Sequence, residues 1–431
     1  MFVAIRRFVV TLALGVLPPG AALAQAPTTS LFRPQLAERR DVRDALQRLE
    51  AGFPAQVEEW IRIARIQGKS QHEQERGALV GQAMRAEGLD VSTDSIGNVI
   101  GRRRGTGGGP TVVFAAHLDI VHPLGTDLAV RRDGDTLRAP GIFDNSASVA
   151  NMLAVIRALN RAGIRTRGDL IFIGTAQEEL GLHGMDYWLE HNPRPDLLVA
   201  MDGGLGPISY GALGIYWTKY HFTSAGSHTV TSRGKPTPVK ALANALDRIY
   251  AMTPSPLPDG AVYNVGQIHG GEIFNGIPER LFFTMDLRSP DPALLDSLDR
   301  TIDGHVAVAA NKEGVEWRKD VVQKNRAGGT EAMLRQRRTH PLVETAIDIY
   351  RFVGVNLPKG REAVASGSTD ANVGVVRGIP SIAVGRSYGG NQHTLSEWAH
   401  WPSALAATKM VLLLAVAMAD GPPAGPATVI P

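Results

Sequence analysis

Hydrophobic residues recur along the chain at two spacings, and the spacing depends on the position. Near the start they repeat every three or four residues, which predicts helices over residues 36–49, 55–66 and 71–87. Short apolar runs typical of buried strands follow at residues 98–101, 111–116, 170–176 and 197–201. A helical pattern at residues 147–162 interrupts these runs. The alternation predicts an α/β fold with a mixed central sheet covered by helices on both faces.

The pattern changes near residue 214. Alternating strands at residues 215–223 and 280–287 flank a helix at 239–252, which predicts a smaller α+β domain inserted into the larger one. A buried strand at residues 381–384 and a helix at 403–417 then resume the first pattern. The predicted parts of the mature chain are the two segments of the larger domain at 25–213 and 326–420, the inserted domain at 214–325, and a disordered proline-rich tail at 421–431.

The N-terminus has the features of a secretory signal peptide. Arg6 and Arg7 precede a short apolar run at residues 8–17, and Ala22-Leu23-Ala24 provides a small-residue cleavage site. We therefore expect residues 1–24 to be removed, the mature protein to begin at Gln25, and its location to be secreted or periplasmic. The apolar run is too short to cross a bilayer, so no stable membrane span is expected.

Composition narrows the class of protein and of site. The 431 residues are 44% hydrophobic and 20% charged, with 45 Lys and Arg against 42 Asp and Glu, and no segment gathers the basic residues into a long stripe. Nucleic acid is therefore not an expected partner. The absence of cysteine excludes disulfides and thiolate ligands, so any metal must be held by His, Asp and Glu.

Residues that can bind a metal occur in an ordered series, and most of them closely follow predicted strands. The series is His117, Asp119, Asp144, Glu178, Glu179, Asp202 and His393. Because ligand sites form beyond the carboxyl ends of strands in an open α/β sheet, His117, the glutamate pair and Asp202 are expected at one edge. Imidazole and carboxylate donors hold Zn²⁺, and two such ions about 3.5–4 Å apart can share a carboxylate and activate one water.

Local spacing suggests a task for several of these residues. Asp119 lies two residues after His117, so in extended chain both project to the same side and Asp119 can bind the ring nitrogen that His117 does not give to metal. Asp144 enters the predicted helix that Asn145 or Ser146 could cap. Of two adjacent glutamates, one can ligate while the other serves as general base.

Taken singly, each of these signals is weak. A His-x-Asp is more often a surface or capping pair, and a Glu-Glu doublet is usually a solvated helix start. Their order and strand-end placement together favour a metal site. The histidines outside the series, His122 among them, have no partner pattern and are expected on the surface or as hydrogen-bonded interior groups.

Further motifs give the chain a resemblance to a known family over residues 70–401. In chain order the motifs are Gly97-Asn98-Val99-Ile100, His117-Leu118-Asp119, Asp144-Asn145, Glu178-Glu179, Asp202, Gly226-Ser227-His228-Thr229, Phe274-Asn275-Gly276-Ile277-Pro278, Asp286-Leu287-Arg288, Ser368-Thr369-Asp370-Ala371, Gly378-Ile379-Pro380 and His393. The chain resembles the co-catalytic zinc amidohydrolases (peptidase family M twenty), which include aminoacylase-1, bacterial glutamate carboxypeptidase, succinyl-diaminopimelate desuccinylase and tripeptidase T.

The resemblance implies a zinc-exopeptidase-like fold, two Zn²⁺ ions and hydrolysis of short peptides or N-acyl amino acids. The implied metal ligands are Asp144 as the bridge, His117 and Asp202 on one ion, and Glu179 and His393 on the other. Glu178 would be the general base, and Asp119 would orient His117. The inserted domain would be a lid that forms a homodimer, with substrate-binding residues His228, Asn275 and Arg288. Co²⁺ or Mn²⁺ fit the same ligands.

Two departures from the family pattern bear on class and substrate. Asn145-Ser146-Ala147-Ser148 after Asp144 resembles single-domain zinc aminopeptidases, although an insertion of ~110 residues favours the lidded family. Asp202 in place of glutamate resembles the tripeptidase and aminopeptidase branches and favours peptides. Two other classes stay open, namely a one-zinc acyltransferase or cyclase, and a binding protein that keeps the ligands without the chemistry.

Overall fold

A seven-stranded sheet lies at the centre of the larger domain. The computed structural model describes residues 29–252, 260–358 and 365–422, so the predicted signal peptide and most of the predicted tail lie outside the described residues. In spatial order the strands are β1 (Asp90–Thr93), β2 (Val99–Arg103), β6 (Leu170–Thr175), β3 (Val112–His117), β7 (Leu197–Met201), β17 (Ser381–Val384) and β8 (Ile208–Ser209). The middle four strands are parallel to one another, whereas the pairings of β1 with β2, β2 with β6 and β8 with β17 are antiparallel, which confirms the predicted mixed sheet.

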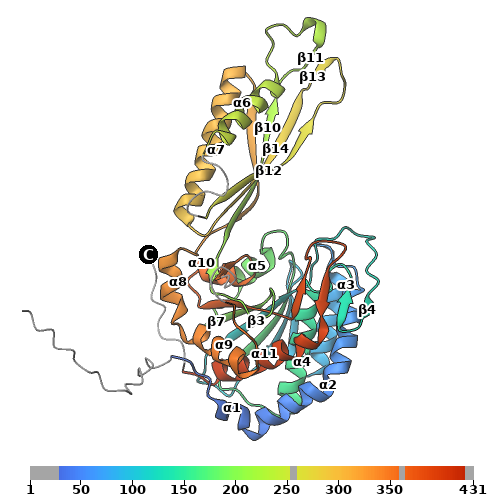
Figure 1. Ribbon diagram of the computed structural model, residues 1–431, viewed down its shortest axis with the longest axis vertical. Coiled ribbons are helices and arrows are strands. Elements are labelled where there is room, and N and C mark those ends of the chain that lie inside the picture. The colour runs from blue at the N-terminus through green and yellow to red at the C-terminus, as the bar shows by residue number, and fades with distance from the viewer. Residues whose placement is uncertain (1–28, 253–259, 359–364, 423–431) are drawn as a thin grey trace, which may run out of the picture.

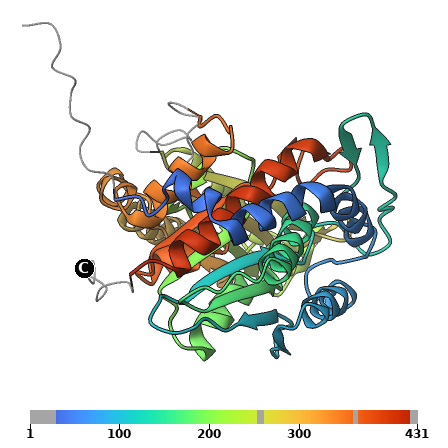
Figure 2. The ribbon, with the colours of Figure 1, turned by 90° about the horizontal axis from the view of Figure 1, so that it is seen from below.

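Side chains of the middle strands alternate between two helical layers. Phe114 and Phe172 stack with ring centroids 5.7 Å apart in the core of one layer. This layer, seen from below in Figure 2, contains α2 (Arg40–Ala64), α3 (Gln74–Ala86), α4 (Ser146–Arg161), α9 (Pro341–Phe352) and α11 (Ala404–Ala419). Val113 and Ile171 face the opposite layer, which contains α5 (His183–His191) and α10 (Ala371–Val376). Burial on both faces explains the uninterrupted apolar runs of these strands.

Helix α2 differs from the sequence prediction, which places a break after residue 49. The helix is continuous over 25 residues, with Pro54 inside it. Leu49, Phe53, Val57 and Trp60 are buried and recur at the spacing of one helical face. A proline removes one main-chain hydrogen bond, and burial of this continuous apolar stripe outweighs that loss.

One segment among the described residues, Trp401–Ala419, is long and apolar enough to cross a membrane. In the structure 72% of it is buried, and α11, which forms most of it, packs against α2, α4 and α9. The core helix of a globular domain can have the same length and composition. The packing of the larger domain therefore accounts for this segment.

Residues from β10 to β15 form a second layered unit with its own core. The order of its antiparallel strands is β12 (Val262–Gly270), β14 (Arg280–Ser289), β10 (Gly214–Thr223) and β15 (Glu316–Asn325). Helices α6 (Pro238–Tyr250) and α7 (Pro292–Glu313) pack against one face of this sheet. Figure 1 shows the unit projecting from the larger domain, with a small two-stranded ribbon of β11 (Ser227–His228) and β13 (Gly276–Ile277) at its far end.

A small antiparallel sheet brings a late segment of the chain beside an early one. Strand β19 (Trp398–His400) pairs with β18 (Tyr388–Gly390) and with β5 (Thr136–Arg138), and β4 (Arg131–Asp133) completes the sheet. The loop 391–397 is thereby fixed next to the loop 139–145. The remaining short elements are α1 (Pro34–Glu38), α8 (Glu331–Arg338), β9 (Gly211–Ala212), β16 (Ser366–Gly367) and the 3₁₀ turns Thr229–Thr231 and Trp401–Ser403.

Candidate metal centre

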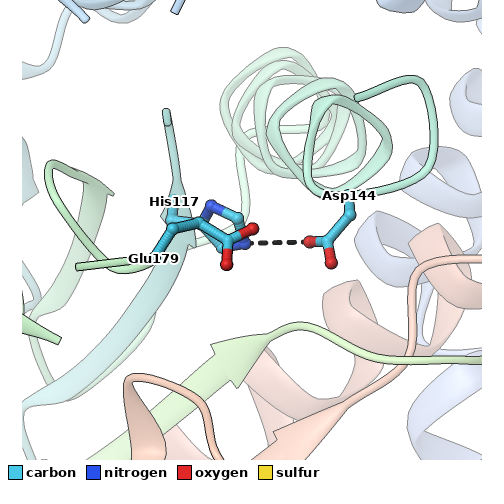
Figure 3. A group of neighbouring side chains, drawn as sticks. All are labelled: His117, Asp144 and Glu179. Carbon is cyan, nitrogen blue, oxygen red and sulfur yellow. Dashed lines mark hydrogen bonds and ion pairs between the residues drawn. The ribbon is translucent and has the colours of Figure 1, made fainter. Parts of the chain in front are cut away.

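The predicted ligands converge at the carboxyl edge of the central sheet. His117 is the last residue of β3, Glu178 and Glu179 follow β6, and Asp202 follows β7. These three strands are adjacent. Two sets of donor atoms lie within 4.8 Å of one another, namely His117 with Glu178 and Asp202, and His117 with Asp144 and Glu179. Figure 3 shows the second set, in which Asp144 faces His117 from the chain that enters α4.

Asp144 lies between the two histidines of the series. Its Oδ1 atom is 3.0 Å from His117 Nε2, and its Oδ2 atom is 3.5 Å from His393 Nε2. His393 Nε2 is also 3.2 Å from Glu179 Oε1. The two oxygens of one carboxylate thus face different imidazoles, which is the arrangement needed to share a carboxylate between two cations. The His393 side chain is 52% exposed, so this end of the cluster opens to solvent.

Asp119 is fully buried and ties two strand ends together. Its carboxylate accepts hydrogen bonds from Ser70 Oγ at 2.6 Å and from the main-chain N–H groups of Glu178 and Glu179 at 3.1 Å each. His117 Nδ1 lies 3.1 Å from the main-chain oxygen of Asp119 and 3.5 Å from its carboxylate. The main chain is therefore the closer partner of the ring, and the carboxylate mainly orients the loop that carries the two glutamates.

A glutamate absent from the sequence predictions holds the loop of Asp144. Glu397 is buried, and its carboxylate accepts from the main-chain N–H groups of Gly141 at 2.9 Å, Phe143 at 2.8 Å and Asp144 at 2.7 Å. Burial raises the pKa of Glu397, and these N–H groups partly oppose the shift. The loop 391–397 thus carries both His393 and the acceptor that positions the carboxylate facing it.

The predicted cap of α4 is wrong. Asn145 precedes the helix, but its side chain makes no capping hydrogen bond. Its amide donates instead to the main-chain oxygen of Met201 at 3.0 Å, and its oxygen accepts from Arg386 at 3.1 Å. Ser146 Oγ donates to the main-chain oxygen of Gly141 at 2.6 Å. Both side chains are fully buried, so they bind the neighbouring segments that surround them.

Two further buried residues of the cluster had no role in the sequence analysis. Arg386 follows β17, and its guanidinium lies 3.2 Å from Asp144 Oδ1 and donates to Asp202. Asp370 precedes α10 and accepts from Thr175 Oγ1 at 2.6 Å. Burial raises the pKa of Asp370 to about 7. The sequence signals were a lone charge after a buried strand for Arg386, and a motif of the resemblance for Asp370.

The sequence predicts that His122 lies on the surface or is a hydrogen-bonded interior group, and both alternatives are wrong. It is 6% exposed, and its Nε2 atom has no hydrogen-bond partner among the described residues, lying 3.8 Å from Glu397 Oε2. Burial lowers the pKa of His122, and the charge of His393 adds to the shift. The ring is therefore a neutral neighbour of the loop that carries His393.

Without a metal, protons balance part of the negative charge of the cluster. Burial raises the pKa of Glu178 well above its usual value against the opposing charge of His117, and the charge of Glu179 adds to the shift. Burial alone would lower the pKa of His117, but the surrounding carboxylates raise it well above 6.5. Hydrogen bonds to Asp144 and Glu179 raise the pKa of His393 to about 10. Cations that bind here therefore displace protons.

The three predicted substrate-binding residues lie in the inserted unit. His228 Nε2 and Asn275 Nδ2 are 3.3 Å apart on the exposed two-stranded ribbon at its far end, away from the metal ligands (Figure 1). Arg288 lies in β14 and pairs with Asp286 at 3.1 Å. Within the described chain, none of the three makes a hydrogen bond or ion pair with the ligand cluster. The ligand cluster of this chain and the two-stranded ribbon are thus separate in space.

The sequence and the fold both have relatives among known proteins. Residues 113–417 match the model of Peptidase family M20/M25/M40. Carboxypeptidase G2 of Pseudomonas sp. (strain RS-16) is 24% identical over 370 residues, which cover 84% of this chain and 85% of that protein. N-carbamoyl-L-amino-acid amidohydrolase of Rhizobium meliloti is 23% identical over 284 residues, 53% of this chain and 63% of that protein. A tripeptidase structure from Staphylococcus aureus has a TM-score of 0.68 at 20% identity and covers 87% of this chain and 99% of its own.

We expect Zn²⁺ binding to release protons and to weaken as the pH falls. In the metal-free protein His393 keeps its proton up to about pH 10, and only a neutral imidazole binds a metal. The ion pairs of protonated His393 with Asp144 and Glu179 also stabilise the metal-free fold. This contribution is complete below about pH 6.5 and is lost as the pH rises through about 10.

Calorimetric titration of Zn²⁺ in buffers of different ionisation enthalpy measures the protons released. The His393→Ala variant should release about one proton fewer than the wild type, because that ring no longer takes part. Release of no protons by the wild type near neutral pH would contradict the described charge balance.

Proposed function

The chain belongs to peptidase family M20/M25/M40, a family of metal-dependent peptidases and amidohydrolases, and from this we propose that it is an exported two-zinc hydrolase. Its proposed substrates are short peptides or N-acyl amino acids. The observation that carries the proposal is the position of Asp144, whose two oxygens face His117 and His393. A carboxylate in that position can bridge two ions.

Each ion has its own set of protein donors in this proposal. His117 and Asp202 would hold one ion, Glu179 and His393 would hold the other, and Asp144 would be shared between the two, as the spacing of these donors permits. Zn²⁺ held by these residues would supply Lewis-acid chemistry, with a lowered pKa of a bound water and a polarised amide carbonyl. Imidazole and carboxylate also suit Co²⁺ and Mn²⁺, so metal analysis of protein from its natural source must decide among the three.

Glu178 is the proposed general base. Its carboxylate lies within 4.8 Å of the donor atoms of His117 and Asp202, and the side chain is buried. Asp119 holds its main-chain N–H, which fixes where the side chain starts. Glu178 takes the proton of the attacking water and passes it to the nitrogen of the leaving amine. Cations beside it favour the carboxylate form that this task requires.

The relatives support small amino-acid derivatives as substrates. They are named as a carboxypeptidase, an N-carbamoyl-L-amino-acid amidohydrolase and a tripeptidase, and these names share cleavage of a C–N bond beside an amino acid. The ligand cluster has two sets of metal-donor atoms, which favours this function over that of a one-zinc acyltransferase or cyclase. The presence of Glu178 beside the ligands favours it over a binding protein. Asp202 makes peptides the first substrates to test.

Residues 214–325 are the proposed lid and dimerisation domain. The two-stranded ribbon that carries His228 and Asn275 is exposed and lies at the far end of this unit, away from the metal ligands of its own chain (Figure 1). These two side chains can therefore reach substrate only in a second copy of the protein or after a large closure. A homodimer in which the ribbon of each copy completes the active site of the other satisfies this geometry, and Arg288 binds substrate from β14.

Replacing Glu178 by Gln should abolish nearly all hydrolysis while metal and fold are retained. The amide has the size of the carboxylate but cannot take a proton, and loss of a general base costs about 10²–10⁴-fold in rate. Mass spectrometry of products from free-amine di- and tripeptides and N-acylated amino acids, with zinc-loaded protein, measures the loss and identifies the substrate class.

Glu190→Gln is the matched control for this experiment, because Glu190 is about half exposed on α5 and pairs with Arg377 outside the cluster. It should hydrolyse at the wild-type rate. Substantial turnover by Glu178→Gln with two metals bound would remove Glu178 from the role of base. Wild-type protein that cleaves no member of the panel would count against the proposed function.

Mixing two inactive variants should restore activity if His228 acts in the second copy. The His228→Ala variant lacks the histidine of the ribbon and the Glu178→Gln variant lacks the base. A mixed dimer contains one site with both residues intact. Random exchange of subunits should recover about a quarter of the wild-type rate. Activity of His228→Ala alone at the wild-type level would show that His228 has no role. No recovery on mixing would show that His228 acts on the active site of its own copy.

Export should leave a mature protein that begins at Gln25. The motif that motivates this is Arg6-Arg7, the apolar run at residues 8–17 and Ala22-Leu23-Ala24. The intact mass of protein recovered from the natural host should equal that of residues 25–431. Replacement of Ala24 by a large residue should leave the precursor uncleaved, and a mass of the full chain in the wild type would contradict export by this route.

A further inference from the structure

Arg386 contacts only one side of the ligand cluster. Its Nη2 atom lies 3.2 Å from Asp144 Oδ1, and its Nη1 atom donates to Asp202 Oδ1. Asp144 Oδ1 is the oxygen that faces His117, whereas Oδ2 faces His393. Within the described chain, Arg386 makes no hydrogen bond or ion pair with Glu179 or His393.

The guanidinium is held so that it cannot leave this position. Arg386 is 1% exposed, and its charged group lies 4.1 Å above the ring of Phe143. Nη1 also donates to Asn145 Oδ1 at 3.1 Å, and the main-chain oxygen of Arg386 accepts from Asn151 at 2.9 Å. A charge buried in this way is stable only while it stays paired, so the carboxylates and the guanidinium fix one another.

The contacts also determine which carboxylate oxygen stays available. Asp202 Oδ1 accepts from Arg386 and, at 2.6 Å, from the main-chain N–H of Gly203. Both donors bind the same oxygen, so Oδ2 accepts from neither of them, and one oxygen of this carboxylate lies within 4.8 Å of the donor atoms of His117 and Glu178. A planar guanidinium can hold two carboxylates at once, which the single ammonium of lysine does less well.

We propose that Arg386 is a positioning residue that makes the two metal positions unequal. It orients Asp202 and one oxygen of Asp144 for the ion on the His117 side and has no part in holding the ion on the Glu179 and His393 side. The inference rests on the proposed two-metal function. Arg386 therefore strengthens binding of the ion on the His117 side alone. Groups that orient metal ligands typically contribute about 10–100-fold to metal affinity.

Titration of metal-free protein with Zn²⁺ against a chromogenic chelator tests this inference, with the bound metal counted after gel filtration. Wild type should bind two ions per chain. Arg386→Met, which keeps the length but not the charge, should bind one ion within a few-fold of its wild-type affinity and the other about 10–100-fold more weakly. Arg386→Lys should recover part of the loss and covers the case in which the methionine variant does not fold.

A second substitution locates the ion that remains. In the Arg386→Met background, His393→Ala should abolish binding of the remaining ion, whereas Asp202→Asn should not change it. Tyr350→Phe is the matched control, because the Tyr350 hydroxyl accepts from the N–H of Gly385 at 2.9 Å, next to Arg386, and its loss disturbs the same loop but spares the guanidinium. This variant should still bind two ions with unchanged affinities.

Equal weakening of both ions, unchanged affinities in Arg386→Met, or tighter binding on the His117 side would each overturn the assignment. Loss of one ion in Tyr350→Phe would overturn it as well, by tracing the effect to loosening of the loop. Wild-type protein that binds fewer than two ions would instead contradict the proposed function, and this result is read from the wild type before any variant is compared.

Discussion

The structure depends on how several carboxylates are kept together at one edge of the sheet. Asp144, Glu178, Glu179 and Asp202 lie close enough that their repulsion, in surroundings of low dielectric, would separate them without opposing charge. Protonated imidazoles supply that charge in the metal-free protein, and the buried guanidinium of Arg386 supplies it permanently. The strand order and the main-chain N–H groups of the loops then keep the carboxylates from moving apart.

The general plan of the fold and most of the ligand series could be predicted from the sequence because both are encoded locally. Apolar runs identified the buried strands, and the residues that follow β3, β6 and β7 meet because parallel neighbours end at the same edge. Residues that act through distant partners left no such pattern. Arg386 and Glu397 contact the Asp144 loop across more than two hundred residues, and periodicity carries no information on such pairs.

Two local errors have the same physical origin. Two separate periodic stretches predicted a break in α2, and an asparagine before α4 predicted a cap, yet tertiary packing decided both cases. The apolar face of α2 continues past Pro54 because the core lies along its whole length. The side chain of Asn145 hydrogen-bonds to Met201 and Arg386 because a buried amide needs partners for both its N–H groups and its oxygen.

The inserted unit joins the larger domain through neighbouring strands. β10 begins and β15 ends at the junction, and these two strands pair there, with Ile215 opposite Asn325. The unit has its own hydrophobic core, separate from those of the larger domain. Two adjacent chain segments connect the two separately packed units, and such a connection permits bending without disturbing either core. The metal ligands can therefore stay in place while the ribbon of β11 and β13 moves.

The position of Glu397 in the chain has a consequence for biosynthesis. The cluster draws on segments from residue 117 to residue 397, and the N–H groups around Asp144 find their acceptor only in the last of these. A nascent chain therefore lacks the complete centre until residue 397 has been translated, and contacts between such distant segments form late in folding. A chain that crosses a membrane unfolded carries no bound metal with it. Under the export proposed for this protein, the compartment in which it folds, and not the one in which it is made, would therefore determine which ion it acquires.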